Sequence, residues 1–176
     1  MVQRLSRREA MGVAALAGIL EACGSGAKIP NAVHLMGERV QAGAMFYSVM
    51  EADWHDQLGS GSSARVPQGK FCVIRLTITN SGNRETIVPL LHLENEKGES
   101  FLELSDAEGV EEWMGPLRPL NPAETLQGRI LFDVKPANYL LRVTDGGEPD
   151  REKTAQVAIQ FKIKESGPLA APTGDK

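Results

Sequence analysis

Apolar and polar residues alternate along three segments of this chain, at residues 71–80, 128–134 and 157–164. Successive side chains of a β-strand point to opposite faces, so this alternation predicts strands with one buried and one solvated face. Such strands are typical of antiparallel sheets. Phe132 and Phe161 each have Ile or Val two residues away on either side, and we expect both rings in a core between two sheets.

Four further strands are expected at residues 45–53, 86–94, 100–104 and 140–144. The segments between strands carry turn-forming residues, for example Asn-Ser-Gly-Asn at 80–83 and Asp-Gly-Gly at 145–147. Many short strands with frequent turns, and no long crossover helices, predict an all-β sandwich.

One short helix is expected within residues 105–114. Ser105 is suited to cap its first turn, and the negative charges of Asp106 and Glu108 suit a helix N-terminus. The predicted fold is therefore all-β with at most this one short helix.

The first 23 residues have the organisation of a bacterial lipoprotein export signal. A positive region with Arg4, Arg7 and Arg8 precedes an apolar run at residues 11–20, which is too short to span a bilayer. The sequence Leu-Glu-Ala-Cys at 20–23 then resembles a lipobox ending at the cysteine that is lipidated. Ser-Arg-Arg at 6–8 also resembles a twin-arginine signal, and both Sec and twin-arginine export remain open.

This signal sets the expected organisation of the chain. Residues 1–22 are the signal peptide, and residues 23–32 are the lipidated Cys23 with a flexible tether rich in small residues. Residues 33–164 form the β-sandwich, and residues 165–176 are a disordered tail. The expected location is extracytoplasmic, with the lipid on Cys23 holding the domain to the bacterial cell membrane.

Charge excludes nucleic acid as an expected partner. The whole chain has a net charge of −4. Removal of residues 1–22 lowers Lys+Arg from 19 to 16 and Asp+Glu from 23 to 21, which leaves −5. The remaining Lys and Arg are scattered and form no basic stripe for a phosphate backbone.

The second cysteine, Cys72, stands alone on the apolar side of a predicted strand once Cys23 is assigned to lipidation. We expect it to be a small buried hydrophobe with a raised pKa, not a disulfide partner or a reactive thiol.

A metal site is one functional hypothesis. His34, Met36 and His55 offer imidazole and thioether ligands of the kind that suit Cu(I), so a copper-type carrier is considered. Met45 and Met50 differ in strand parity and should point to opposite faces. His55 also lies close to Asp53, which would orient an imidazole for general-base chemistry, although a solvated loop histidine is the simpler interpretation.

A non-catalytic binding module is the other hypothesis. The sequence contains no nucleophile elbow, Walker loop, dinucleotide fingerprint or His-Glu-x-x-His motif, so we expect neither an enzyme nor a cofactor. Trp54 and Trp113 lie in two stretches, residues 53–67 and 107–117, that are the expected contact surface of such a module. These rings are candidate contacts for an envelope protein or cell-wall partner, with burial at the end of the sandwich as the alternative.

A succession of segments resembles one known family. The segments are residues 36–40, 46–49, 67–73, 77–82, 91–98 followed by Phe101, and 120–128 leading into 131–134. In order and spacing they are similar to the telokin-like, immunoglobulin-fold family of bacterial secreted domains of unknown function, of the domain of unknown function 4352 type. The resemblance covers about residues 34–164 and implies an immunoglobulin-like antiparallel β-sandwich. Ala123 stands where that family commonly has Gly, which leaves the type of that turn open.

Overall fold

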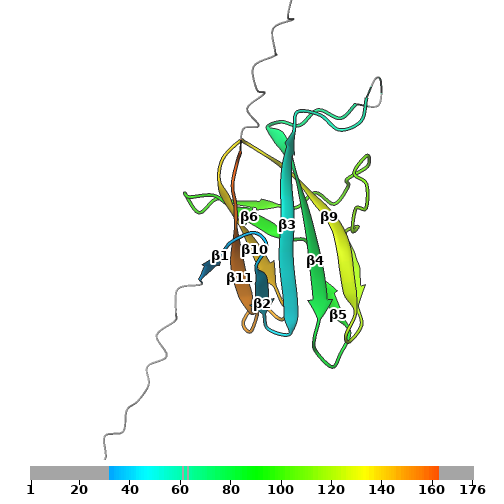
Figure 1. Ribbon diagram of the computed structural model, residues 1–176, viewed down its shortest axis with the longest axis vertical. Coiled ribbons are helices and arrows are strands. Elements are labelled where there is room, and N and C mark those ends of the chain that lie inside the picture. The colour runs from blue at the N-terminus through cyan, green and yellow to red at the C-terminus, as the bar shows by residue number, and fades with distance from the viewer. Residues whose placement is uncertain (1–31, 61, 63, 163–176) are drawn as a thin grey trace, which may run out of the picture.

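The structure, a computed structural model, describes residues 32–60, 62 and 64–162. These residues contain eleven strands. A four-stranded antiparallel sheet has the order β2 (Arg39–Ala42), β3 (Met45–His55), β4 (Lys70–Asn80) and β9 (Thr125–Val134). It packs against the five-stranded sheet (Figure 1). The expectation of an all-β, immunoglobulin-like sandwich is confirmed.

The five-stranded sheet has the order β1 (Val33–His34), β11 (Thr154–Ile159), β10 (Tyr139–Thr144), β6 (His92–Glu94) and β7 (Ser100–Leu102). Its pairs are antiparallel except β1 with β11, which run in the same direction. A small sheet joins β5 (Thr86–Val88) to β8 (Arg118–Leu120). The chain crosses from one large sheet to the other between β1 and β2. Residues 32–42 therefore contribute one strand to each large sheet.

The core lies between the two large sheets and consists of the residues that the alternation placed inward. Cys72, Ile74, Leu76 and Ile78 of β4 are each 0% exposed, as are Ile130 and Phe132 of β9. Leu141, Val143, Val157 and Ile159 meet them from the five-stranded sheet. Full burial of these apolar side chains stabilises the sandwich by roughly 1.5–3 kcal/mol for each Leu, Ile, Val or Phe.

Three of the predicted strands are divided or end earlier in the structure. The run at residues 86–94 is split at Pro89, with β5 in the small sheet and β6 in the five-stranded sheet. The run that begins at Val157 leaves the sheet after Ile159, earlier than expected. The run at residues 100–104 ends at Leu102.

The predicted helix within residues 105–114 is wrong. The described residues contain no α-helix, and this segment is a series of turns across the outer face of β4 and β9. Gly109 and Glu112 have φ angles of +88° and +54°, outside the right-handed helical region. Ala107 is buried in a second cluster with Leu58, Phe71, Val73 and Leu131, and this tertiary contact outweighs the capping preference of Ser105.

The two ends of the sandwich differ. We name as the distal end the one where β3, β9 and β11 finish, which is uppermost in Figure 1. The proximal end holds the turn between β2 and β3 and the segment between β10 and β11. No helix in the described ranges is long and apolar enough to cross a membrane. The predicted signal peptide, Cys23, all but the last residue of the tether and the predicted tail lie outside the described residues.

Candidate functional site

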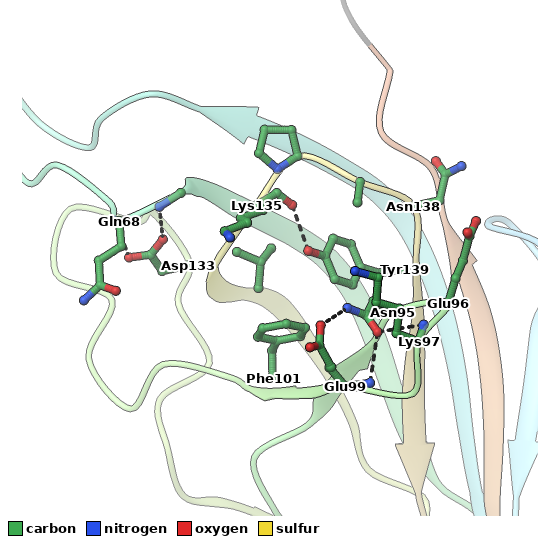
Figure 2. A pocket seen from close by; sticks show the side chains of 14 residues that line it. Gln68, Asn95, Glu96, Lys97, Glu99, Phe101, Asp133, Lys135, Asn138 and Tyr139 are labelled. Atoms are coloured by element: carbon green, nitrogen blue, oxygen red, sulfur yellow. Dashed lines mark hydrogen bonds between the residues drawn. The ribbon is translucent and has the colours of Figure 1, made fainter.

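An open cleft of about 910 Å³ lies at the distal end. Three segments that are far apart in sequence form its walls: Gln68–Gly69 before β4, Asn95–Glu99 between β6 and β7, and the residues between β9 and β10 (Figure 2). Small-molecule sites in proteins commonly occupy about 300–1,000 Å³. The cleft is therefore large enough to hold such a ligand.

Aromatic rings form the interior side of the cleft. Phe101 lies perpendicular to Tyr139, with ring centroids 5.8 Å apart. Tyr139 in turn stacks on Trp54 at 6.2 Å, and Trp54 meets Phe161 edge-on at 5.1 Å. Because each ring is held by the next, the aromatic floor connects directly to the core.

Phe161 corrects one of our expectations. Phe132 is fully buried as predicted, but Phe161 is only half-buried and lies beyond the end of β11, against Trp54. The strand ends because the Phe161 backbone N–H donates to the side-chain oxygen of Asn138 at 3.1 Å instead of to a neighbouring strand. The alternation of apolar and polar residues continues to residue 164, although β11 stops pairing with β10 after Ile159.

Hydrogen bonds within the protein hold the rim of the cleft. The side-chain oxygen of Asn95 accepts from the backbone N–H groups of Lys97 and Glu99 at 3.0 and 2.9 Å. Its amide group donates to the Glu99 carboxylate at 2.6 Å. The Asp133 carboxylate accepts from the backbone N–H groups of Gln68 and Gly69 at 2.7 and 2.9 Å. These bonds fix the loops before any ligand arrives, which lowers the entropic cost of binding.

Gly69 shows how closely two of these walls approach. A Cβ atom at this position would lie 2.5 Å from the carbonyl oxygen of Val134. Only glycine allows the chain before β4 to lie against the end of β9 in this way. Within the wall between β9 and β10, the Tyr139 hydroxyl donates to the Lys135 carbonyl at 2.8 Å.

The ionisable groups of the cleft are acids, amines and the Tyr139 phenol. Glu96, Lys97, Glu99, Asp133 and Lys135 line it, whereas no Ser, Cys or His is among its lining residues. The carboxylates of Glu99 and Asp133 are engaged in the rim. The side chains of Glu96, Lys97 and Lys135 form no hydrogen bond or ion pair with the described residues. The arrangement therefore offers hydrogen bonds and charge to a ligand, without a nucleophile paired to an imidazole.

The candidate metal ligands do not converge. The backbone N–H of Gly37 donates to the Val49 carbonyl at 2.8 Å, which places neighbouring Met36 beside the middle of β3. His55 ends β3 six residues later, about 20 Å away at ~3.3 Å per residue. His34 Nδ1 lies 3.2 Å from a carboxylate oxygen of Glu38. Metal ligands must lie within about 2.0–2.3 Å of a shared ion, so these three residues form no common site.

The rest of the described ranges offers no metal site of this kind either. They contain no group of three or more His, Cys, Asp or Glu side chains placed to hold a metal ion. Met45 is fully buried and Met50 is 51% exposed, as their opposite parity predicted. Core packing accounts for Met45.

The other residues selected from sequence lie away from the cleft lining. Asp53 and His55 are cross-strand neighbours of Val73 and Phe71, and neither lines the cleft. Cys72 is 0% exposed, and burial raises the pKa of its thiol to about 12, with the charge of Asp53 as a smaller cause. Its predicted burial is confirmed.

Both tryptophans are half-buried and neither stands out as a free surface anchor. Trp54 supports the aromatic floor, and Trp113 packs on the second cluster and bridges to Arg129 of β9. The indole N–H of each is buried without a hydrogen-bond partner among the described residues. Their assignment as binding residues stays a prediction.

Sequence reasoning missed the residues that form the cleft, above all Lys97, Phe101, Lys135 and Tyr139. One signal pointed toward them. Residues 67–73, 91–98 with Phe101, and 131–134 carry the family resemblance, and all three segments reach the distal end in the fold. A search for where such segments meet would have found this site.

Comparisons with known proteins give a family and a fold. The family model described as "Domain of unknown function (DUF4352)" matches residues 34–147, which are 114 of the 176 residues. Among curated proteins, none matches this sequence.

Several solved structures are similar to the sandwich. The yjhA protein from Bacillus subtilis is 13% identical with a TM-score of 0.54, over 71% of this chain and 99% of that one. A candidate lipoprotein, ycdA from Bacillus subtilis subsp. subtilis str. 168, is 14% identical with a TM-score of 0.56, over 72% of this chain but only 39% of its own. A functionally unknown protein from Listeria monocytogenes EGD-e is 10% identical with a TM-score of 0.50, over 71% and 82%. At these identities the likeness shows the fold.

Proposed function

The chain belongs to the DUF4352 family, and from this premise we propose that it is a lipid-anchored, extracytoplasmic binding module that holds a ligand in the distal cleft without catalysis. The observation that carries the proposal is the preformed cleft itself. Its rim is fixed by the bonds of Asn95 and Asp133, and its floor is tied to the core through Tyr139. Rigid walls of this kind suit recognition, because little ordering is left for the ligand to induce.

The lining residues support binding over catalysis. Ser- or Cys-dependent catalysis needs that nucleophile with a base, commonly His, within hydrogen-bond reach, and the cleft is lined by no Ser, Cys or His. The carboxylates of Glu99 and Asp133 accept hydrogen bonds that hold the loops of the rim.

The direction of the chain supports a membrane-facing proximal end. Strand β1 runs parallel to β11, and β11 runs toward the distal end, where Phe161 bonds to Asn138 of the cleft. The chain therefore enters the domain heading toward the cleft, from the opposite side. Nine residues, 24–32, lie between Cys23 and Val33, and the ten Cα–Cα steps reach at most about 35 Å when fully extended. This reach allows the cleft to point away from the membrane, and that orientation is part of the proposal.

The extracytoplasmic location rests on the lipobox-like sequence at residues 20–23 and the apolar run before it. One of the similar solved structures is itself a candidate lipoprotein. The lipid anchor is part of the proposal, which holds for either Sec or twin-arginine export.

The test is a binding map on the ¹⁵N-labelled fragment 27–176, which keeps both sheets, both core clusters and the whole family match. Titration with 2-naphthol, a small neutral aromatic probe, should shift amide resonances of residues 68–69, 95–101 and 134–139. Gln68→Trp should reduce these shifts, because the larger side chain competes for the cleft. Shifts confined to the proximal end, or none at all, would reject the cleft as a binding site.

A further inference from the structure

We infer that the ligand of the distal cleft is a small organic anion, with a carboxylate group on a planar, apolar body. This inference rests on the proposed function, because it names the ligand class of the same cleft. Two observations support it: the hydrogen-bonding groups that the rim leaves free, and the Phe101 ring on the interior side of the cleft (Figure 2).

The first step is to separate used from unused polar groups. Asp133 and Glu99 accept bonds from the rim, and the Asn95 amide donates its bond to Glu99. These groups build the walls and already hold hydrogen bonds within the rim. A ligand that depended on them would have to break the bonds that hold the loops.

The groups left over are mostly donors. Lys97 and Lys135 each bring an ammonium with three N–H bonds and no partner among the described side chains. The oxygen of the Asn138 side chain accepts from Phe161, so its amide group remains available as a donor. The one free carboxylate in the lining is that of Glu96. An excess of free donors favours a ligand rich in acceptors, and a carboxylate matches ammonium groups best.

The overall charge of the cleft and of the chain does not explain a preference for an anionic ligand. Three acidic and two basic residues line the cleft, and the mature chain is acidic overall. The preference must therefore come from direct contact with the two lysines.

The apolar part of the ligand follows from the floor. Phe101 is half-buried, held perpendicular to Tyr139, and has Val134, Pro136 and Ala137 nearby in the lining. A planar body can cover this ring in an offset-stacked or edge-on arrangement. A cleft volume of about 910 Å³ suits one small molecule, not a folded partner.

The experiment compares three probes of one shape on the fragment 27–176: 2-naphthoate, 2-naphthamide and 2-naphthylmethylammonium. We expect the carboxylate to bind about ten times more tightly than the amide, and the cation most weakly, with shifts at residues 95–101 and 134–139. Lys97→Gln and Lys135→Gln should each weaken 2-naphthoate about threefold to fivefold and leave 2-naphthamide unchanged. Lys153→Gln, at an exposed proximal position, is the matched control and should change neither.

The outcomes separate the two proposals. If amide and carboxylate bind the cleft equally, or if both lysine variants bind 2-naphthoate like wild type, the anion inference is wrong and the cleft remains a binding site. If none of the three probes reaches the cleft, the proposed function fails together with the inference. The variants test charge and not folding, since Lys97 and Lys135 are exposed, and unchanged amide spectra outside the cleft verify this.

Discussion

The hydroxyl of Tyr47 in β3 donates a hydrogen bond of 2.5 Å to the backbone carbonyl of Thr144 in β10, across the two sheets of the sandwich. Tyr47 is fully buried, and burial raises the pKa of its phenol far above the ordinary value of 10.0. A neutral phenol in this place ties the sheets together through one directed bond in an otherwise apolar layer.

Tyr47→Phe should therefore lower the free energy of unfolding by about 1–3 kcal/mol, because the Thr144 carbonyl loses its donor in the core. Urea unfolding followed by fluorescence measures the loss. Tyr139→Phe is the matched control, because its hydroxyl bonds to Lys135 in a part-buried loop and should matter less. Equal stability of Tyr47→Phe and wild type would show that the bond contributes nothing.

Ala123 holds a backbone conformation that costs energy. Its φ angle is +64°, and its N–H donates to the Asn80 carbonyl at 2.8 Å. The turn thus has the geometry that a glycine would adopt without strain, which answers the question left open by the sequence. Ala123→Gly should stabilise the domain by about 0.5–1.5 kcal/mol, since the left-handed penalty exceeds the added freedom of the unfolded chain.

The measurement is the thermal midpoint of the fragment 27–176, which should rise for Ala123→Gly. Ala44→Gly serves as control: Ala44 is also exposed in a turn but is not among the non-glycine residues with positive φ. That substitution should be neutral or destabilising. A fall in the midpoint for Ala123→Gly would show that the turn is not strained.

Strand content was predictable because alternation is a local property. β4 carries its pattern over 11 residues, with Cys72, Ile74 and Leu76 all inward, and the partner strands only confirm it. The helix prediction failed at Gly109 and Glu112, where tertiary contacts of Ala107 decide the backbone. Local preference was a weak guide there.

The cleft could not be predicted in the same way. Lys97 and Lys135 are 38 residues apart, and Gln68 is separated from both, so their meeting depends on the order of strands in two sheets. Composition and motif searches select residues by type, and nothing distinguishes these lysines from the other surface lysines. The two lysines are candidate ligand contacts because the nearby carboxylates of Asp133 and Glu99 already bond to the rim. Only the fold shows these bonds.

The ion pair of Glu103 and Arg118 is completely buried. Glu103 also accepts from the backbone N–H of Leu91 at 3.1 Å, and Arg118 donates to the Gly115 carbonyl at 2.8 Å. Glu103→Ala should cost about 3–5 kcal/mol, because it leaves the guanidinium buried without its counter-charge.

Chemical unfolding of three variants checks this account of the pair. The double variant Glu103→Leu with Arg118→Met should recover much of the loss, since no charge then remains buried. Glu51→Ala breaks the partly exposed pair with Arg75 and should cost less than about 1 kcal/mol. If Glu103→Ala is no worse than Glu51→Ala, the buried pair has no special role.

Cys72 should behave as a buried thiol. Cys72→Ser should destabilise the domain by about 1–3 kcal/mol, because a hydroxyl in the apolar layer lacks a partner. A thiol reagent at pH 8 should label the native chain very slowly and the unfolded chain fully. Rapid labelling of the native form would contradict the burial.

The same thiol makes stability depend on pH. Its pKa is about 12 in the folded state and near 9.0 when exposed, so the native state holds the proton more tightly. The stabilisation is complete below pH 9 and is lost as the pH rises toward 12. Comparison of wild type with Cys72→Ala isolates this contribution, since the variant should lose less stability over the same pH range.

Cys23→Ser in the full-length chain should abolish membrane attachment or leave the protein as an uncleaved precursor. The reason is that the lipobox-like sequence at 20–23 places this cysteine where the acyl chains are attached, and stable anchoring needs more than one chain. Cell fractionation with mass spectrometry of the isolated protein distinguishes the outcomes, because lipidation and signal removal both change the mass. Cys72→Ser is the matched control, since it also removes a thiol but should still fractionate with membranes. A Cys23→Ser protein that has the wild-type mature mass and stays in the membrane would show that another feature anchors the domain, and the proposed orientation of the cleft would lose its basis.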